Sequence, residues 1–251
     1  MTTTVSTPDR STETTRGGER NGSVRLGTIL VTGGASGLGA ATVSAVSAAG
    51  GTPLVLDLQQ PADGVRGLTV DLSDTAAAEA AVDEIVAQAR GRLDGVVTAA
   101  GIDSCGRLDE VPRSSWERVV SVNLLGTAAV VRAALPHLRR SHGRVVTVAS
   151  TLGIKAVSDA TAYCASKFGV VGFTRALAAE TAGQVGVTLL IPGGMHTPFF
   201  DGRTEQYKPA PDAVLNQPED VAATVVFALS QPAGCEVREL VVACSTETSW
   251  P

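Results

Sequence analysis

The sequence is poor in aromatic residues and in cysteine, and it has no long uninterrupted apolar run. Only 4% of its residues are aromatic, and its four cysteines show no C-x-x-C pairing. A disulfide framework or a zinc ribbon is therefore not expected. The Ala/Val-rich stretches are interrupted by Arg, Glu, Gly or Pro, so none reaches the roughly 20 residues of a membrane span. Since no apolar signal segment opens the chain either, we predict a cytoplasmic protein with free thiols.

Basic residues are also scarce. The chain has 20 Lys and Arg against 25 Asp and Glu, a net charge of -5, and no basic cluster lies on an expected helix. This argues against a nucleic-acid partner and favours a small molecule. Only three histidines occur, scattered along the chain, so we predict no metal site. What the chain does have is 44% hydrophobic residues in a length of 251, enough for one large buried core.

The first 24 residues differ in composition from the rest. They are rich in Thr, Ser, Arg and Gly and have almost no large apolar side chains. Such a segment cannot bury enough surface to offset the entropy of ordering, so we predict a disordered tail. A partner-binding arm is the alternative, although the mixed charge gives it no specific support. No repeat or further shift in composition follows, which predicts a single domain over residues 25–251.

From Leu26 onward, short apolar runs alternate with longer segments of helical character. This pattern predicts an α/β fold, a single-domain, Rossmann-like, doubly wound parallel sheet of about seven strands with helices on both faces. The expected strands span residues 28–31, 53–56, 67–70, 95–99, 144–149, 187–191 and 239–242. The expected helices span 38–49, 75–90, 114–139, 160–182 and 218–229. Residues 193–217 contain three prolines and break this rhythm, which predicts a functional loop for substrate.

A glycine-rich turn joins the first strand to the first helix. Here Gly33 permits a tight turn, Gly37 lets a pyrophosphate approach the backbone, and Gly39 allows close packing of helix on strand. The helix N-terminus, around Ser36 and Leu38, favours negative charge. Glycine-rich turns also occur for purely structural reasons, so this turn alone is a weak signal.

An acidic residue strengthens the prediction of a dinucleotide site. Asp57 ends the second strand, where a carboxylate can accept hydrogen bonds from an adenosine ribose. It would repel a 2′-phosphate, which favours NAD(H) over NADP(H) unless Arg66 or another basic residue folds into reach. Asp71 and Leu72 end the third strand, where they either contact the adenine or form the turn that starts a helix.

Tyr163 and Lys167 lie four residues apart, on one face of an expected helix. A free phenol has a pKa of about 10, and a neighbouring ammonium favours the phenolate, so we expect Lys167 to lower the pKa of Tyr163. By itself this pair is usually a solvated helix face. Its weight comes from Ser150, which follows a buried strand 13 residues earlier and can donate a hydrogen bond to a developing alkoxide.

In these motifs the sequence resembles the short-chain dehydrogenase/reductase family, from Leu26 to about Val242. The resemblance implies that Ser150 polarises the carbonyl, that Tyr163 exchanges the proton, and that Lys167 also binds the nicotinamide ribose. It implies that Asn123 holds a water that links Lys167 to solvent. It also implies a group of cofactor contacts along the chain: Gly33, Ser36, Gly37, Leu38, Gly39, Asp57, Asp71, Leu72, Ala100, Gly101, Tyr163, Lys167, Pro192, Gly193 and Thr197.

Two departures from the family pattern stand out. The family's Asn-Asn-Ala-Gly after the fourth strand is here Thr98-Ala99-Ala100-Gly101, which loses amides that brace the central sheet. The family's Gly-Gly at the end of the last strand is replaced by Val241 to Cys244. The first departure puts local stability in doubt more than chemistry, and the second puts packing and subunit contacts at that edge in doubt.

The resulting prediction is an NAD(H)-dependent oxidoreductase that interconverts a secondary alcohol and a ketone, in narrower form a ketoreductase of specialised metabolism. The alternatives are an NAD-binding sensor without turnover and an epimerase or dehydratase that uses transient oxidation. The resemblance also implies that the long helix at 114–139 and the Tyr163 helix pack in the interface of a homo-oligomer, a dimer or tetramer. Around the substrate we expect a mobile lid from Met195, Phe199, Phe200 and Tyr207, the alternative being that these side chains only anchor the loop to the core. We expect His196 to be a loop residue that does not touch the substrate, and Cys105 not to act as a nucleophile.

Overall fold

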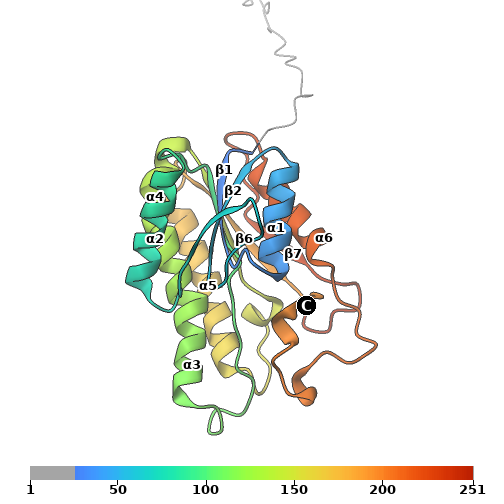
Figure 1. Cartoon of the computed structure of the whole chain (residues 1–251). Coiled ribbons are helices and arrows are strands. Elements are labelled where there is room, and N and C mark those ends of the chain that lie inside the picture. The colour runs from blue at the N-terminus through green and yellow to red at the C-terminus, as the bar shows by residue number, and fades with distance from the viewer. Residues whose placement is uncertain (1–25, 251) are drawn as a thin grey trace, which may run out of the picture.

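The computed structural model describes residues 26–250, so the tail predicted at 1–24 lies outside the described residues. Strands and helices alternate along most of the chain (Figure 1). The strands are β1 Thr28–Thr32, β2 Thr52–Asp57, β3 Arg66–Thr69, β4 Gly95–Thr98, β5 Arg144–Val148, β6 Gly186–Pro192 and β7 Glu239–Val242. The α-helices are α1 Gly37–Ala48, α2 Thr75–Gln88, α3 Arg113–Val120, α4 Thr127–Ser141, α5 Thr161–Glu180 and α6 Pro218–Leu229.

The seven strands form one parallel sheet in the order β3-β2-β1-β4-β5-β6-β7. The chain therefore begins in the middle of the sheet, builds one half outward from β1, and crosses over to build the other half from β4. Between β1 and β4 the direction of winding reverses, and ligands of such sheets bind outside the carboxyl ends of the strands at that point. The predicted fold class is confirmed.

Helices cover both faces of the sheet, α1 and α6 on one side and α2, α4 and α5 on the other (Figure 1). Alternation along β1 explains the two layers, because successive side chains of a strand point to opposite faces. Leu30 is buried against the α2 and α4 side with Ile85, whereas Val31 is buried against the α1 and α6 side with Val46. Both faces are thus apolar, as a parallel sheet requires.

The helix predicted over 114–139 is not a single α-helix. A π-helical segment, η1, occupies Ser121–Gly126 between α3 and α4. A Cβ at Gly126 would lie 2.6 Å from the Leu72 carbonyl oxygen, so the backbone packs closely there. The π segment also places Asn123 inward, where it is 1% exposed. Segments of this kind are frequent at functional sites.

This stretch, 113–141, is also the one helical stretch of the described chain that is long and apolar enough to cross a membrane by length and composition. Half of its apolar window is buried inside the fold, where α4 packs against α2. A buried core helix meets the same two criteria.

The predicted substrate loop, residues 193–217, contains two short 3-10 helices, η3 Pro198–Phe200 and η4 Glu205–Tyr207. Its two ends approach each other, since the Asn216 amide donates to the Gly194 carbonyl at 3.0 Å and the His196 amide to the Asn216 carbonyl at 2.9 Å. The loop therefore leaves β6 and returns beside it, above the carboxyl edge of the sheet.

Candidate active site

A cavity of about 750 Å³ lies at the carboxyl edge of the sheet, across the reversal between β1 and β4. It is lined by the loop between β1 and α1, the ends of β2, β4, β5 and β6, the first turns of α5, the substrate loop and residues near the C-terminus. Every site residue predicted from the sequence except Asn123 lines this cavity. The sequence thus indicated the cavity from motifs spread along most of the chain.

The glycine turn at one end of the cavity is closely packed. Gly33 has a φ of +71°, and a Cβ there would lie 2.7 Å from the Ala100 Cα atom. A Cβ at Gly39 would clash with the Gly33 carbonyl. Ser36 is the N-cap residue of α1, but its side chain makes no capping hydrogen bond, so the first amides of the helix have no partner from that hydroxyl. The turn leaves room for an anion at the start of α1.

Asp57 stands at the end of β2, beside this turn. Its Oδ2 accepts a hydrogen bond from the Ala35 amide and its Oδ1 one from the Gln59 amide, both at 2.9 Å. The carboxylate therefore fixes the glycine turn, and each of its oxygens can accept a further hydrogen bond. Arg66, the basic residue considered from the sequence, is held elsewhere by the Gln88 carbonyl oxygen at 2.7 Å.

Asp71 forms the turn before α2 and also lines the cavity. Its Oδ1 accepts from the Ser73 amide and hydroxyl, and its Oδ2 pairs with Arg118 at 3.0 Å. The hydrogen bonds from Ser73, followed by Arg118, hold the pKa of this carboxyl below its usual value. Leu72 beside it is buried. The sequence left two roles open for Asp71 and Leu72. The structure has the turn before the helix, and because both residues also line the cavity, contact with an adenine is still possible.

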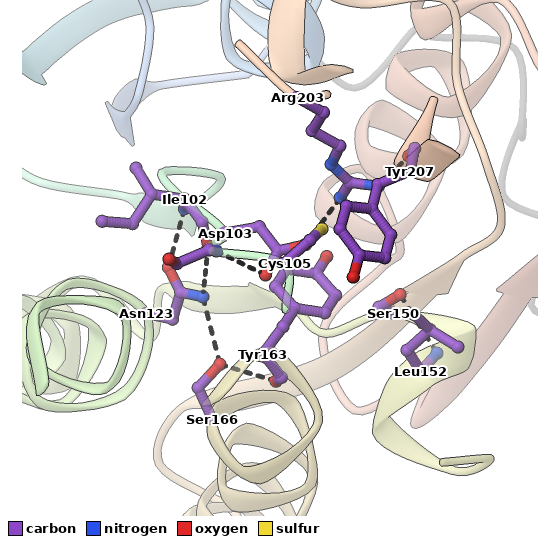
Figure 2. A network of polar contacts seen from close by, with 11 residues as sticks. Ile102, Asp103, Cys105, Asn123, Ser150, Leu152, Tyr163, Ser166, Arg203 and Tyr207 are labelled. Atoms are coloured by element: carbon purple, nitrogen blue, oxygen red, sulfur yellow. Dashed lines mark hydrogen bonds and ion pairs between the residues drawn. The ribbon is translucent and has the colours of Figure 1, made fainter. Parts of the chain in front are cut away.

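Ser150, Tyr163 and Lys167 come together at the other end of the cavity. Figure 2 shows the Tyr163 ring rising from α5 toward Ser150, which follows β5. The Ser150 Oγ accepts from the Leu152 amide at 3.1 Å, so its own proton stays available for donation into the cavity. The Lys167 Nζ donates to the Val148 carbonyl oxygen at 2.9 Å and lies 5.7 Å from the centre of the Tyr163 ring.

Burial shifts both titratable groups of this trio toward their neutral forms. Burial raises the pKa of Tyr163 to about 12, although a hydrogen bond with the Ser150 hydroxyl lowers it in part. Burial also lowers the pKa of Lys167 to about 8. We expected the Tyr163 pKa to lie below its ordinary value; it lies above, because the loss of hydration penalises the phenolate more than its neighbours favour it.

Asn123 lies behind the cavity wall rather than on it. Its side chain accepts from the Ile102 amide at 2.8 Å and donates to the Ile102 carbonyl and to the Ser166 hydroxyl. These bonds tie the π segment to the loop after β4 and to α5 (Figure 2). A Cβ at Gly101 would lie 3.6 Å from both Asn123 Oδ1 and Lys167 Nζ. Asn123 is thus beside Lys167, where it braces the site.

The departure after the fourth strand has a structural consequence. The Thr98 hydroxyl is buried and has no hydrogen-bond partner. The neighbouring Ala100 amide is satisfied across the sheet by the Thr32 hydroxyl at 3.2 Å. A hydroxyl of β1 therefore stabilises the chain after β4, while the buried Thr98 hydroxyl on β4 has no hydrogen-bond partner.

The substrate side of the cavity has an aromatic and a polar wall. Of the four residues predicted to form a lid, Met195, Phe199 and Phe200 line it and Tyr207 does not, and His196 does not line it either. Sequence reasoning missed the polar wall, made by the chain end: Glu247, Thr248 and Ser249.

Long-range hydrogen bonds hold the chain end there. Glu247 Oε2 accepts from the Gly194 amide at 3.0 Å, and the Ser249 hydroxyl donates to the Thr151 hydroxyl at 2.7 Å. The residue types at 247–249 carry no local signal of this fold-back, because they read as an ordinary polar terminus.

A pair of charged residues near Tyr163 was also missed. Asp103, in the loop after β4, pairs with Arg203 of the substrate loop at 2.7 Å, and Arg203 lines the cavity. Cys105 donates a hydrogen bond to Asp103 at 3.2 Å, and burial, followed by Asp103, raises the pKa of this thiol to about 11. Cys105 is thus a poor nucleophile, in agreement with the expectation.

Known proteins have similar sequences and a similar fold. The family model for short chain dehydrogenases matches residues 27–208. A D-threitol dehydrogenase of Mycolicibacterium smegmatis is 32% identical over 226 residues, which cover 81% of this chain and 86% of the relative. The 2-dehydro-3-deoxy-L-rhamnonate dehydrogenase (NAD(+)) of a Sphingomonas strain is 34% identical over 218 residues, which cover 80% and 87%.

Among solved structures, ligand-free aldohexose dehydrogenase of Thermoplasma acidophilum matches with a TM-score of 0.78, covering 88% of this chain and 93% of that one. Its sequence identity of 24% limits that likeness to the fold. The match to the family model and the similarity to the two relatives show the family as well: the chain belongs to the short-chain dehydrogenase/reductase family.

Proposed function

We propose that the chain is an NAD(H)-dependent dehydrogenase that interconverts a secondary alcohol and a ketone, with Tyr163 as its general acid and base. The observation that carries the proposal is the cavity itself. It has a glycine turn and Asp57 at one end and Ser150, Tyr163 and Lys167 at the other. Membership in a family of oxidoreductases acting on alcohols supports the reaction class.

The residues present fit a dinucleotide. Gly33 and Gly39 keep the turn free of side chains at two positions where a Cβ would clash, and the start of α1 has amides to offer a pyrophosphate. Asp57 would bind the adenosine ribose, and the segment from Pro192 to Thr197 would hold the carboxamide. When bound, the nicotinamide supplies the hydride acceptor or donor.

Asp57 is the reason to prefer NAD(H). A carboxylate at the ribose repels a 2′-phosphate, and the cations on the cavity wall are engaged elsewhere: Arg118 by Asp71, Arg203 by Asp103, and Lys167 by Val148. The Sphingomonas relative, whose name specifies NAD(+), supports the same preference.

Proton transfer falls to Tyr163. In the reducing direction its neutral phenol donates to the oxygen that gains negative charge, while Ser150 donates a second hydrogen bond to that oxygen. In the oxidising direction the phenolate must accept the alcohol proton, so the Lys167 ammonium beside the ring favours the reaction. Asn123 supports this end of the site by its bonds to Ile102 and Ser166.

Size and lining favour a small, polar substrate. Phe199 and Phe200 supply apolar lining, while Thr151, Glu247 and Ser249 supply hydroxyl and carboxylate groups. Relatives named for threitol and for a deoxy sugar acid act on small polyhydroxylated molecules. We therefore propose a polar alcohol or cyclic ketone, in narrower form the substrate of a specialised-metabolism ketoreductase.

The test is turnover by the purified protein. We expect NADH absorbance to rise with NAD+ and members of a panel of polyols, sugar lactols and cyclic secondary alcohols, and to rise far less with NADP+. Binding of NADH without turnover of any alcohol or ketone would indicate a sensor. Conversion without net NADH, by protein that retains bound NAD, would indicate an epimerase or dehydratase.

Asp57 gives the cofactor part of this proposal its own test. In Asp57→Asn the ratio of kcat/KM for NAD+ over NADP+ should fall about tenfold, the scale of one charged hydrogen bond. Asp83→Asn, on the exposed surface of α2, is the matched control and should leave the ratio unchanged. An unchanged ratio in Asp57→Asn would contradict the assignment of Asp57 to the ribose.

A further inference from the structure

Two charged side chains that the proposed reaction does not use lie beside Tyr163. Asp103 follows β4 and Arg203 belongs to the substrate loop, so the pair joins two segments 100 residues apart. Their nitrogen and oxygen atoms are 2.7 Å apart, and the side chains are only 5% and 18% exposed. Removal of one partner would leave an uncompensated charge in a buried place, which is costly. The pair is therefore a strong constraint on where the loop lies.

Both partners are held in place by further contacts. Asp103 accepts hydrogen bonds from the Ser104 amide at 2.7 Å and from Cys105 Sγ at 3.2 Å. The Arg203 guanidinium donates to the Tyr207 carbonyl oxygen at 3.2 Å. Figure 2 shows this cluster directly above the Tyr163 ring.

The aromatic rings of the lid connect Arg203 to Tyr163. The guanidinium carbon lies 4.9 Å from the centre of the Phe199 ring and 4.7 Å from that of Phe200. The Phe199 ring centre is in turn 5.6 Å from that of Tyr163. The chain of contacts runs from Asp103 through Arg203 and Phe199 to the phenol.

The two charges act on the phenol in opposite directions. After burial and Ser150, Asp103 raises the pKa of Tyr163 and Arg203 lowers it, and Cys164 on α5 raises it. Lys167 faces the ring from the same helix at 5.7 Å. With both members of the pair present, their opposite effects on the pKa of Tyr163 offset each other. The substrate loop can therefore lie close to the phenol while the pair adds no net charge beside it.

We propose that Asp103 and Arg203 are positioning residues, a charge-balanced latch that holds the lid formed by Phe199 and Phe200 against Tyr163. The proposal rests on the role of Tyr163 proposed above. Arg203 lines the cavity and Asp103 does not, so a bound substrate meets the lid through Arg203 and the rings, while Asp103 holds the lid through its ion pair with Arg203.

A purely structural brace would make a different prediction. If the pair only held two loops together, Asp103→Asn and Arg203→Met would loosen the lid alike and change the pH dependence in the same way. If it also balances charge, Asp103→Asn leaves a buried cation near the phenol and lowers the pKa of Tyr163. Arg203→Met leaves a buried carboxylate and raises it.

The experiment is the pH profile of kcat/KM for alcohol oxidation in both variants, the double variant and Arg203→Lys. We expect each single variant to lose about tenfold in kcat/KM, the scale of one charge-assisted hydrogen bond. The limb that reports Tyr163 should move to lower pH in Asp103→Asn and to higher pH in Arg203→Met. It should return near its native position in the double variant. In Arg203→Lys the limb of the pH profile should stay at its native position, and the loss in kcat/KM should come chiefly from a higher KM, because lysine keeps the charge but lacks the planar guanidinium group.

Matched controls come from an exposed ion pair in the same loop after β4, Arg107 with Asp109. Arg107→Met and Asp109→Asn should leave the profile unchanged. The same shifts can be read without any substrate from tyrosinate absorbance in a Tyr207→Phe background, because the chain has only two tyrosines.

Opposite shifts support the latch. Shifts of equal sign, or none in variants whose far-UV circular dichroism is native, overturn it. Tyr163→Phe separates the two proposals: if it abolishes activity while the pair has no effect on the profile, only the latch is wrong, whereas full activity in Tyr163→Phe overturns the function on which it rests.

Discussion

Tyr163 and Lys167 have pKa values displaced in opposite directions by one cause, burial. For the lysine the folded state disfavours the charged form, so between about pH 8 and its ordinary value of 10.5 the unfolded chain binds more protons. The free energy of unfolding must rise with pH across that window. For the tyrosine the folded state disfavours the phenolate. Its contribution to the free energy of unfolding is therefore lost only as the pH rises above the ordinary tyrosine pKa of 10.0.

Lys167 therefore predicts a pH dependence of stability. Between pH 8 and 10, the unfolding free energy of the native chain should rise by roughly 2 kcal/mol relative to Lys167→Met, which lacks the titrating group. Urea unfolding midpoints at several pH values measure it. Parallel pH curves for the two proteins would show that Lys167 titrates normally.

The buried hydroxyl of Thr98 predicts a stabilising substitution. Thr98→Val removes a polar atom that has no partner and should raise the free energy of unfolding by about 1 kcal/mol. Thr147→Val is the matched control on β5, because that hydroxyl bonds Thr174 at 2.6 Å and its loss should cost about 1 kcal/mol. Thermal melts compare the two, and a Thr98→Val protein less stable than the native chain would contradict the account.

Among the secondary structure elements, the strands and most helices could be predicted from periodicity to within a residue or two, because both faces of the sheet are apolar. The π segment at Ser121–Gly126 could not. Its sequence has the periodicity of an ordinary α-helix. The wider turn matters for contacts with residues outside the helix, such as that of Asn123 with Ile102, which the local sequence does not reveal. The fold-back of the C-terminal residues was unpredictable for the same reason, since its bonds join residues 53 and 98 positions apart.

The turn between β1 and α1 predicts a large effect for one methyl group. Gly39→Ala should destabilise the protein by about 2 kcal/mol and weaken NADH binding at least tenfold, because the added Cβ meets the Gly33 carbonyl. Gly64→Ala, in a surface loop with a φ of +83° and open space around it, separates strain from packing. It should cost about 1 kcal/mol and leave NADH binding unchanged. Fluorescence titration with NADH decides, and equal affinity in both variants would count against the cofactor cradle.

For the whole molecule, exposed apolar residues give the expected self-association a location. Leu125 in the π segment is 49% exposed and Phe168 on α5 is 45% exposed, and these two elements pack against each other. Phe168→Glu should shift the protein toward monomer in sedimentation velocity. Leu108→Glu, at an exposed apolar residue in the loop after β4, should not. A native chain that sediments as a monomer would contradict the expected homo-oligomer.

The site as a whole shows what a sequence can and cannot reveal. The residues proposed for cofactor binding and proton transfer sit in short motifs with fixed spacing, such as Tyr163 and Lys167, so they could be found by inspection. Asp103 and Arg203 meet only through the fold, each looks like an ordinary loop charge, and no spacing relates them. The charged pair and the C-terminal part of the cavity wall were therefore hidden in the sequence, whereas the residues proposed for proton transfer were visible.

The most direct test of the central claim compares the only two tyrosines of the chain. Tyr163→Phe removes the proposed acid and base; Tyr207→Phe removes a phenol that does not line the cavity. We predict that Tyr163→Phe lowers kcat by at least about 100-fold, the scale of general acid-base catalysis, while it binds NADH with near-native affinity. Tyr207→Phe should keep most of the native rate. Full activity in Tyr163→Phe would contradict the account.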